Sequence, residues 1–177
     1  MQNAIQIRLL SVIGERELRE LSDVLIDCVE AGASVSFMFP MTGDKAAVFW
    51  RHAAECLARR ERIVVIAEDS AGSIVGTVQV MLDQPENQPH RAEVSKMLVH
   101  RRVRRQGVGA ALLSAAEQAA RSAGKTLLVL DTANDEAARL YERQGWQRCG
   151  EIPNYALWPD GGLCATTIYY KSLPPIQ

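Results

Sequence analysis

A hexapeptide of arginine and glycine residues has the chemistry to bind an anion. It reads Arg104-Arg105-Gln106-Gly107-Val108-Gly109, and it lies between an apolar run that ends at Val99 and an alanine-rich run. Glycine at 107 and 109 removes Cβ atoms where backbone N–H groups would point outward from a helix N-terminus, a geometry that holds pyrophosphate. Arginine side chains would add charge-assisted hydrogen bonds. The hexapeptide therefore predicts a phosphate site, although a solvated basic turn would account for it equally well on its own.

The surrounding sequence gives this hexapeptide a context. Neither G-x-x-x-x-G-K-[ST] nor a G-x-G-x-x-G after a strand is present. Further along, Asn134 to Trp146 reads NDEAARLYERQGW. The run 94–112 and this segment resemble the two signatures of the GNAT superfamily of N-acetyltransferases, R-x-x-G-x-G after a strand and N-x-x-A-x-x-x-Y-E-x-x-G-[FWY]. The resemblance implies an enzyme, an acyltransferase that uses acetyl-CoA as acetyl donor and acetylates an amine.

The resemblance also implies a coenzyme A site. Backbone groups of Met97 and Val99 would hold the pantetheine arm like an added strand, and the loop after them would surround the pyrophosphate. Met97 and Val99 also suit a plain core strand. The expected cofactor-binding residues are Met97, Leu98, Val99, Arg104, Arg105, Gln106, Gly107, Val108, Gly109, Ala110, Asn134, Ala137 and Tyr141.

Tyr141 and Asn134 each have two interpretations. By resemblance, the Tyr141 phenol protonates the departing thiolate of coenzyme A; as a bare feature, a tyrosine beside Leu140 is more often core packing. Asn134 would cap its helix and, by resemblance, also hydrogen-bond the cofactor near the thioester. The cap alone would explain an asparagine there.

Two carboxylates are candidates for the proton transfer that amine acetylation requires. The amine must be neutral to attack, so a carboxylate, or a water that it holds, must remove a proton. Glu93 begins the strand of the first signature and Asp131 ends the next strand, so parallel strands that splay apart would bring both to one cleft. We expect Glu93 to be the base and Asp131 to hold the substrate's ammonium group. A solvent-facing Glu93 paired with Arg91, and a turn role for Asp131, remain alternatives.

Apolar and aromatic loops are expected to line the acceptor site. The segments 33–39 and 154–158 supply exposed aromatic residues in loops, which suit a substrate wall but also a contact between two copies of the chain. The expected substrate-binding residues are Ser34, Phe37, Met38, Glu93, Asp131, Tyr155 and Trp158. Short segments such as Gly32-Ala33-Ser34-Val35 and Leu130-Asp131-Thr132 are similar to the tabtoxin resistance acetyltransferases, which implies a small-molecule amine such as a tabtoxin-like β-lactam toxin or antibiotic.

The hydrophobic pattern predicts a single α+β domain over residues 1–177. Alternating apolar residues predict strands and apolar residues at helical spacing predict helices, in an order that gives a mixed sheet with helices on both faces. The expected strands cover about 5–9, 63–67, 74–82, 92–100, 126–131, 146–152 and 164–173; the expected helices cover about 15–31, 44–60 with Asp44 as N-cap, 107–123 and 134–144. Ile74, Val78 and Val80 should share one face of their strand, and the strand over 126–131 should be covered on both faces. Gly124 and Gly145 should end the last two helices. The resemblance implies a GNAT-type, mostly antiparallel sheet of about seven strands and about four helices, splayed between the strand over 92–100 and the next.

Composition and net charge argue against several other kinds of partner and site. With 177 residues and a net charge of −1, the chain has no general attraction for nucleic acid or an anionic membrane, and a nucleic-acid patch at 100–105 has no accompanying basic stripe or aromatic residues. The four cysteines are scattered, so we expect neither a metal site nor disulfides but buried or half-buried thiols.

The chain has no apolar run that could span a bilayer and does not begin with a signal segment, so we expect a cytoplasmic protein, with a homodimer as one arrangement. A non-catalytic acyl-CoA sensor remains the alternative to an enzyme.

Overall fold

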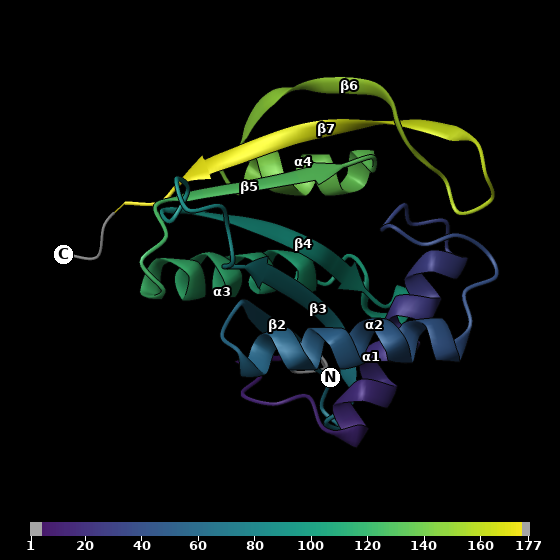
Figure 1. The fold of residues 1–177 in the computed structure, drawn as a ribbon. Helices are drawn as coiled ribbons and strands as arrows, with labels where there is room; N and C mark the ends of the chain where they lie inside the picture. The colour runs from purple at the N-terminus through teal and green to yellow at the C-terminus, as the bar shows by residue number, and fades with distance from the viewer. Residues whose placement is uncertain (1–4, 175–177) are drawn as a thin grey trace.

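A seven-stranded mixed sheet runs through the computed structural model, which describes residues 5–174 (Figure 1). The strands are ordered β1-β2-β3-β4-β5-β7-β6, and β4 and β5 form the parallel pair among antiparallel neighbours. The strands are β1 (Gln6–Leu9), β2 (Arg62–Glu68), β3 (Ile74–Met81), β4 (Arg91–Val99), β5 (Leu127–Thr132), β6 (Gln147–Leu157) and β7 (Leu163–Ser172). The helices are α1 (Glu15–Glu30), α2 (Gly43–Ala58), α3 (Val108–Ser122) and α4 (Asp135–Arg143), with a short 3-10 turn η1 (Arg101–Val103) before α3. The predicted α+β class is therefore confirmed.

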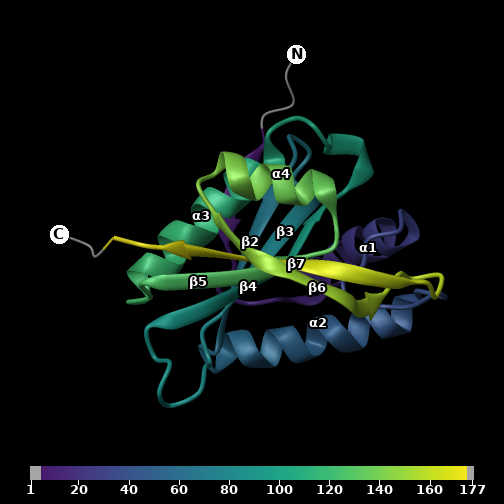
Figure 2. The ribbon, with the colours of Figure 1, turned by 90° about the horizontal axis from the view of Figure 1, so that it is seen from above.

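Two apolar cores lie on the two faces of the sheet. Figure 2 shows α3 and α4 on one side of the strands and α1 and α2 on the other. The α3 and α4 side buries residues such as Leu112, Leu128 and Tyr169, whereas the α1 and α2 side buries Leu25 and Trp50. Burial of large apolar side chains is the main stabilising contribution to such a layered fold.

The parallel strands β4 and β5 pair only at their beginnings. Their register joins Arg91 to Leu127, Ala92 to Leu128 and Glu93 to Val129, and pairing stops there although both strands continue. The remaining backbone groups on the facing edges are thus left without a strand partner between Val94 and Val99. The separation predicted between these strands is confirmed, and it opens the sheet at its centre.

A bulge interrupts β4 where it leaves β5. In the pairing with β3, Thr77 faces Leu98 and Gln79 faces Ser95, so one residue of β3 lies opposite Lys96 and Met97. Lys96 has a positive φ of 51°, a left-handed conformation that costs a residue with a Cβ roughly 1–2 kcal/mol. The bulge turns the strand and changes which side chains face each side of the sheet.

Three details differ from the expectations. Helix α2 begins after Thr42, whose side chain accepts a hydrogen bond from the Lys45 N–H, so Asp44 is in the first turn and is not the cap. Strand β5 was expected to be covered on both faces, but only Leu128 and Leu130 are buried because α1 and α2 pack against β2, β3 and β4. Among the cysteines, Cys149 is exposed on the edge strand β6.

Other helix ends follow the sequence closely. Gly124 and Gly145 adopt positive φ values of 78° and 80° just after α3 and α4, as expected for glycine C-terminal caps. Within residues 5–174, none of the helices combines the length and the apolar character that crossing a membrane requires. The described residues also contain no cluster of His, Cys, Asp and Glu side chains suited to a metal ion.

Candidate active site

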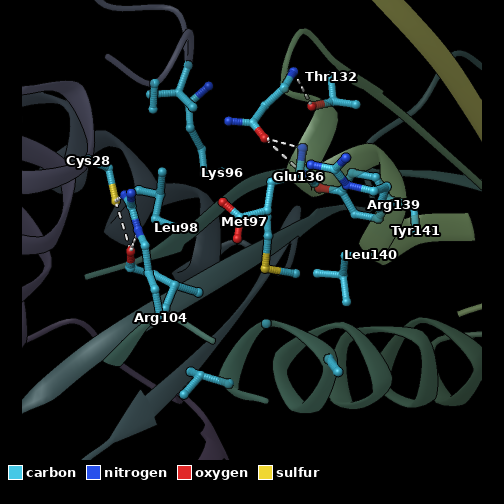
Figure 3. A pocket seen from close by; sticks show the side chains of 18 of the residues that line it. Cys28, Lys96, Met97, Leu98, Arg104, Thr132, Glu136, Arg139, Leu140 and Tyr141 are labelled. Atoms are coloured by element: carbon cyan, nitrogen blue, oxygen red, sulfur yellow. Dashed lines mark hydrogen bonds between the residues drawn. The ribbon is translucent and has the colours of Figure 1, made fainter. Parts of the chain in front are cut away.

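A cavity of about 700 Å³ lies where β4 and β5 separate. Its walls come from the second half of β4, the loop into α3, the end of β5, the inner face of α4 and the segment after α1. Figure 3 shows Cys28 and Arg104 on one side of the cavity, Glu136, Arg139 and Tyr141 on the other, and Lys96 and Met97 between them. The opening of the sheet therefore brings together residues that are more than 100 positions apart in the chain, from Cys28 to Tyr141.

The N-terminus of α3 faces this cavity with unused donors. Gly107 is its N-cap, has a φ of 81°, and provides no side chain to accept from the first turn. The first N–H groups of a helix have no acceptor inside it, and the helix dipole favours an anion there. By contrast, Thr42 caps α2 and Asn134 caps α4 with side-chain oxygens. The first turn of α3 therefore fits a phosphate group.

Gly109 allows the first turn of α3 to lie close to α4. A Cβ at this position would lie 3.0 Å from Leu140 Cδ2, tighter than ordinary van der Waals contact. Both Gly109 and Leu140 line the cavity. The second glycine of the hexapeptide therefore serves helix packing as well as access to the backbone.

The arginines of the hexapeptide hold specific positions. Arg104 Nε donates to the Val99 carbonyl at 3.0 Å, and its Nη2 lies 3.9 Å from Cys28 Sγ. Arg105 also lines the cavity, and its Nε lies 3.5 Å from Oε1 of Glu136 in α4. The charge-assisted contacts expected of these arginines are thus partly directed to protein groups.

Not every expected cofactor residue lines the cavity. The Gln106 side chain turns away and donates to the Arg102 carbonyl at 3.3 Å, whereas the other expected cofactor residues are all in the cavity wall. The Val99 carbonyl already accepts from Arg104 and lies 3.5 Å from Cys28 Sγ. Met97, Leu98, Val99, Arg104, Arg105, Gly107, Val108, Gly109, Ala110, Asn134, Ala137 and Tyr141 are brought together.

A buried carboxylate anchors the start of the anion loop. Asp27 of α1 accepts from the Arg101 backbone N–H at 2.9 Å and from Arg101 Nε at 2.8 Å, and it lies 3.6 Å from His100 Nε2. Burial by itself would raise the pKa of Asp27, but these hydrogen bonds and positive charges lower it. Asp27 therefore stays ionised and ties the segment before the loop to α1.

The side chain of Asn134 uses its oxygen to cap α4 and leaves its amide nitrogen without an acceptor among the described residues. Its Oδ1 accepts from the Glu136 and Ala137 N–H groups at 2.8 and 2.9 Å, which confirms the predicted cap. No described residue accepts from its amide nitrogen, and Asn134 lines the cavity. The side-chain N–H groups are therefore available to a ligand.

Tyr141 is held in place by two other aromatic residues. Its ring centroid lies 5.9 Å from that of Trp146 and 6.0 Å from that of Tyr169. Those two are anchored in turn, Trp146 to Glu117 at 2.8 Å and Tyr169 to Glu142 at 2.8 Å. Tyr141 is 5% exposed and lines the cavity, and its hydroxyl makes no hydrogen bond to the described residues. Burial raises the pKa of Tyr141 well above its usual value, and the charge of Asp131 adds to this, so the phenol keeps its proton.

The two candidate carboxylates are placed differently. Asp131 lines the cavity at the end of β5 and accepts a hydrogen bond from the Thr166 hydroxyl at 2.7 Å. Glu93 is half-buried at the last paired position of β4 and is not part of the cavity wall. Both charges act on Lys96, so they belong to one electrostatic environment.

The expected acceptor residues are only partly assembled. Ser34 lines the cavity, but Phe37 and Met38 do not. Trp158 lines a second, smaller hollow with Thr132 and Asn134, and Tyr155 is 53% exposed on β6 without lining either.

Lys96 is a cavity residue that the motifs did not indicate. Its position inside an apolar strand gave one signal, since a charge there must find polar surroundings. Other additions to the wall include Cys28, Thr132, Ala133, Glu136, Arg139, Leu140, Arg143 and Gln144.

An open mixed sheet whose central parallel strands separate over an uncapped helix N-terminus is the architecture of acetyl-CoA-dependent N-acetyltransferases. The profile of the Acetyltransferase (GNAT) family matches residues 29–146. The chain belongs to this family, and its acetyl donor is acetyl-CoA.

Solved structures agree on the fold. An N-acetyltransferase from Staphylococcus aureus superposes with a TM-score of 0.79 at 17% identity, covering 97% of this chain and 99% of that one. A ribosomal-protein-alanine N-acetyltransferase from Brucella melitensis gives 0.78 at 23% identity, with 95% and 99% covered. A candidate acetyltransferase from Salmonella typhimurium, whose structure includes its cofactor acetyl-CoA, gives 0.77 at 20% identity, with 97% and 95% covered.

Proposed function

We propose that this protein transfers the acetyl group of acetyl-CoA to a primary amine of a small molecule by direct attack within a ternary complex. The observation that carries the proposal is one cavity that joins the uncapped N-terminus of α3, the Tyr141 phenol and the Asp131 carboxylate. Such a cavity lets an anionic cofactor and a cationic amine bind side by side.

The first turn of α3 and the free edge of β4 are the cofactor side of the proposal. Gly107 and the N–H groups after it would hold the pyrophosphate, and Arg104 and Arg105 would add positive charge. The Asn134 amide would hydrogen-bond the arm near the thioester. Acetyl-CoA supplies the activated carbonyl, and the residues of the chain hold it in place.

Proton transfers are assigned to residues on both sides of the cavity. Tyr141 Oη gives its proton to the departing sulfur. The raised pKa of Tyr141 suits this role, because the phenol stays protonated until the thiolate leaves. Asp131 holds the ammonium form of the acceptor, and Glu93 removes the proton from the amine through a water molecule, because Glu93 is not in the cavity wall.

The identity of the acceptor, the oligomeric state and the location of the protein are more specific proposals. A tabtoxin-like β-lactam or another antibiotic or toxin amine is one acceptor to include, as the similarity of short segments to the tabtoxin resistance acetyltransferases suggests. A cytoplasmic homodimer remains a prediction, which sedimentation of the purified chain and cell fractionation would examine.

A thiol-release assay tests the proposed reaction. Purified protein is mixed with acetyl-CoA and a panel of amines that includes amino acids, aminoglycosides, polyamines and tabtoxinine-type β-lactams, and free coenzyme A is followed. Acetylation of any member, confirmed by a product about 42 mass units heavier than the amine, as an added acetyl group requires, and slowed about 100-fold in Tyr141→Phe, supports the proposal. If calorimetry shows that acetyl-CoA binds but no amine of the panel causes release of free coenzyme A, the non-catalytic sensor is favoured instead.

A further inference from the structure

Lys96 lines the cavity and has no carboxylate in ion-pair contact among the described residues. It lines the cavity from the bulge of β4 (Figure 3). The bulge gives Lys96 a φ of 51°, so the position carries conformational strain that glycine or asparagine would relieve. Strained residues with long polar side chains at the wall of a cavity are candidates for function.

The contacts of Lys96 leave its charge largely unneutralised. Its Nζ lies 3.1 Å from Ser36 Oγ, 6.0 Å from the ring centroid of Phe37 and 5.8 Å from that of Phe49. A hydroxyl and two aromatic faces can hold a cation in place. Within residues 5–174, no carboxylate lies within 4.0 Å of this nitrogen, although an ammonium group has three donors to satisfy.

Opposite charge is nearby, but not in contact. The charges of Asp131 and Glu93 act on Lys96 and partly offset burial, which lowers the pKa of Lys96. Asp131 keeps its own partner, Thr166, and faces the same cavity. The cavity therefore presents an ammonium group and a carboxylate that are close enough to interact and too far apart to pair.

A zwitterion placed between them would satisfy both groups. The amine of such an acceptor would face Asp131, and its anionic group would face Lys96. An acceptor that carried only an amine would leave the half-buried Lys96 without an anion and would add a second cation to its surroundings.

We propose that Lys96 binds an anionic group of the acceptor, so that the preferred acceptor is a small amine that carries a carboxylate within a few bonds of its nitrogen. This inference rests on the proposed acetyltransferase function. Lys96 then determines specificity, since it contacts a part of the acceptor that does not react.

Matched acceptors provide the test. Each amino acid in the panel, such as L-lysine or L-2,4-diaminobutyrate, is compared with its primary amide and with its decarboxylated amine, cadaverine or 1,3-diaminopropane. We expect kcat/KM to be about tenfold or more higher for the acid than for either matched compound, since a charge-assisted hydrogen bond is lost in both. Equal values within every set would overturn the inference and leave the acetyltransferase itself intact.

Variants assign the effect to Lys96. Lys96→Met should raise the KM for the acids about tenfold or more and leave the KM for the decarboxylated amines and for acetyl-CoA within about twofold, because only the anion contact is removed. Lys96→Arg should retain the preference for acids. Arg51→Met removes another cation, exposed on α2 and outside the cavity, and should change none of these values.

The remaining outcomes have clear meanings. Equal losses for acids and amines in Lys96→Met would show a different role for Lys96, such as proton transfer, and would overturn the inference. A raised KM for acetyl-CoA would do the same. If the wild-type protein acetylates no compound of the panel, the inference fails together with the proposed function. The comparison of matched acceptors with the wild-type protein needs no variant, so a poorly folded Lys96→Met does not prevent the test.

Discussion

Thr166 Oγ1 donates a 2.7 Å hydrogen bond to Asp131 Oδ2 and thereby fixes a cavity carboxylate against β7. Thr166 is 2% exposed, whereas Asp131 is exposed at the end of β5. One oxygen of Asp131 is thus used by the protein, and in the described structure the other makes no hydrogen bond. A carboxylate held in this way can bind an ammonium group in a fixed direction, because its rotation is restricted before the ligand arrives.

Asp131→Asn should weaken acceptor binding more than chemistry. The amide can still accept from Thr166 but has no charge for the ammonium group, so we expect the acceptor KM to rise about tenfold or more with a smaller change in kcat. Steady-state kinetics at saturating acetyl-CoA measure both. Thr166→Val, which keeps the volume and removes the hydroxyl, should show a weaker form of the same effect. A fall in kcat with an unchanged KM would contradict the assigned role.

Glu93→Gln should have the opposite kinetic signature. In its proposed role as a general base that works through water, Glu93 would contribute to the chemical step, so its loss should lower kcat about 100-fold with little change in acceptor KM. Full activity of Glu93→Gln would transfer the base role to another group.

Tyr141→Phe should lower kcat about 100-fold, the lower end of the range for a general acid. Because the ring is retained between Trp146 and Tyr169, the melting temperature and the dissociation constant of coenzyme A should stay close to those of the wild type. Since the pKa of Tyr141 is raised, its loss of a proton should not cause any fall in rate below about pH 10, the usual pKa of tyrosine. An unchanged kcat would remove Tyr141 from the mechanism.

Asn134 allows the cap and the cofactor contact to be separated. Asn134→Asp keeps an oxygen for the Glu136 and Ala137 N–H groups but removes the amide donor, so it should preserve stability and raise the KM for acetyl-CoA several-fold. Asn134→Ala removes the cap as well as the amide donor, so it should raise the KM for acetyl-CoA and also lower the free energy of unfolding by about 1 kcal/mol. Thr42→Ala removes the cap of α2, away from the cavity, and should lower stability without changing that KM. An Asn134→Asp variant with wild-type kinetics would leave Asn134 with the cap alone.

The sequence predicted what short-range chemistry determines. The Asn134 cap and the stops at Gly124 and Gly145 depend on a side-chain oxygen or on positive φ, so a few residues specify them. Strand β6 was expected to end at Ile152, yet it continues to Leu157, because pairing with β7 resumes after an irregularity that contains Asn154 at a φ of 55°. The length and register of pairing depend on both strands, so the sequence of one strand alone does not specify where the pairing ends.

The site was predicted in the same uneven way. The cofactor loop is contiguous and carries a motif, so nearly all its expected residues line the cavity. Strand β3 was expected to place Ile74 with Val78 and Val80 on one face, but Ile74 packs in the core on the α1 and α2 side. Lys96 was missed for a related reason, since the bulge that positions it arises from the register with β3.

Gly107→Ala should affect cofactor binding as well as stability. Gly107 and Gly72 have φ values of 81° and 77°, and a Cβ at either would meet no atom within 4 Å, so both substitutions carry backbone strain of about 1 kcal/mol without a clash. Gly72 lies in the turn between β2 and β3, whereas Gly107 is the N-cap of α3 in the cavity wall. We expect similar losses of stability by urea unfolding, but a weaker affinity for coenzyme A only in Gly107→Ala. Equal affinities in the two variants would argue against an anion site at α3.

Asp27 should make stability depend on pH in the acid range. Its pKa is lowered in the folded protein, so the stabilising effect of its charge is fully present above the unfolded pKa of about 4 and disappears as pH falls through the lower folded value. Asp27→Asn should therefore cost about 1–3 kcal/mol at pH 7, because the buried contacts with Arg101 lose their charge.

The difference between Asp27→Asn and wild type should shrink as the pH falls through the lowered pKa of Asp27, because the wild-type carboxyl then also becomes neutral. Asp23→Asn, on the exposed side of the same helix, is the matched control and should change stability little at pH 7. Urea titrations at several pH values measure the difference, and a gap that stayed constant down to the lowest pH would mean that the charge of Asp27 is not what matters. Since Asp27 holds the segment that leads into the hexapeptide, Asp27→Asn should also weaken coenzyme A binding at pH 7, and that loss should disappear with the stability difference as the pH is lowered.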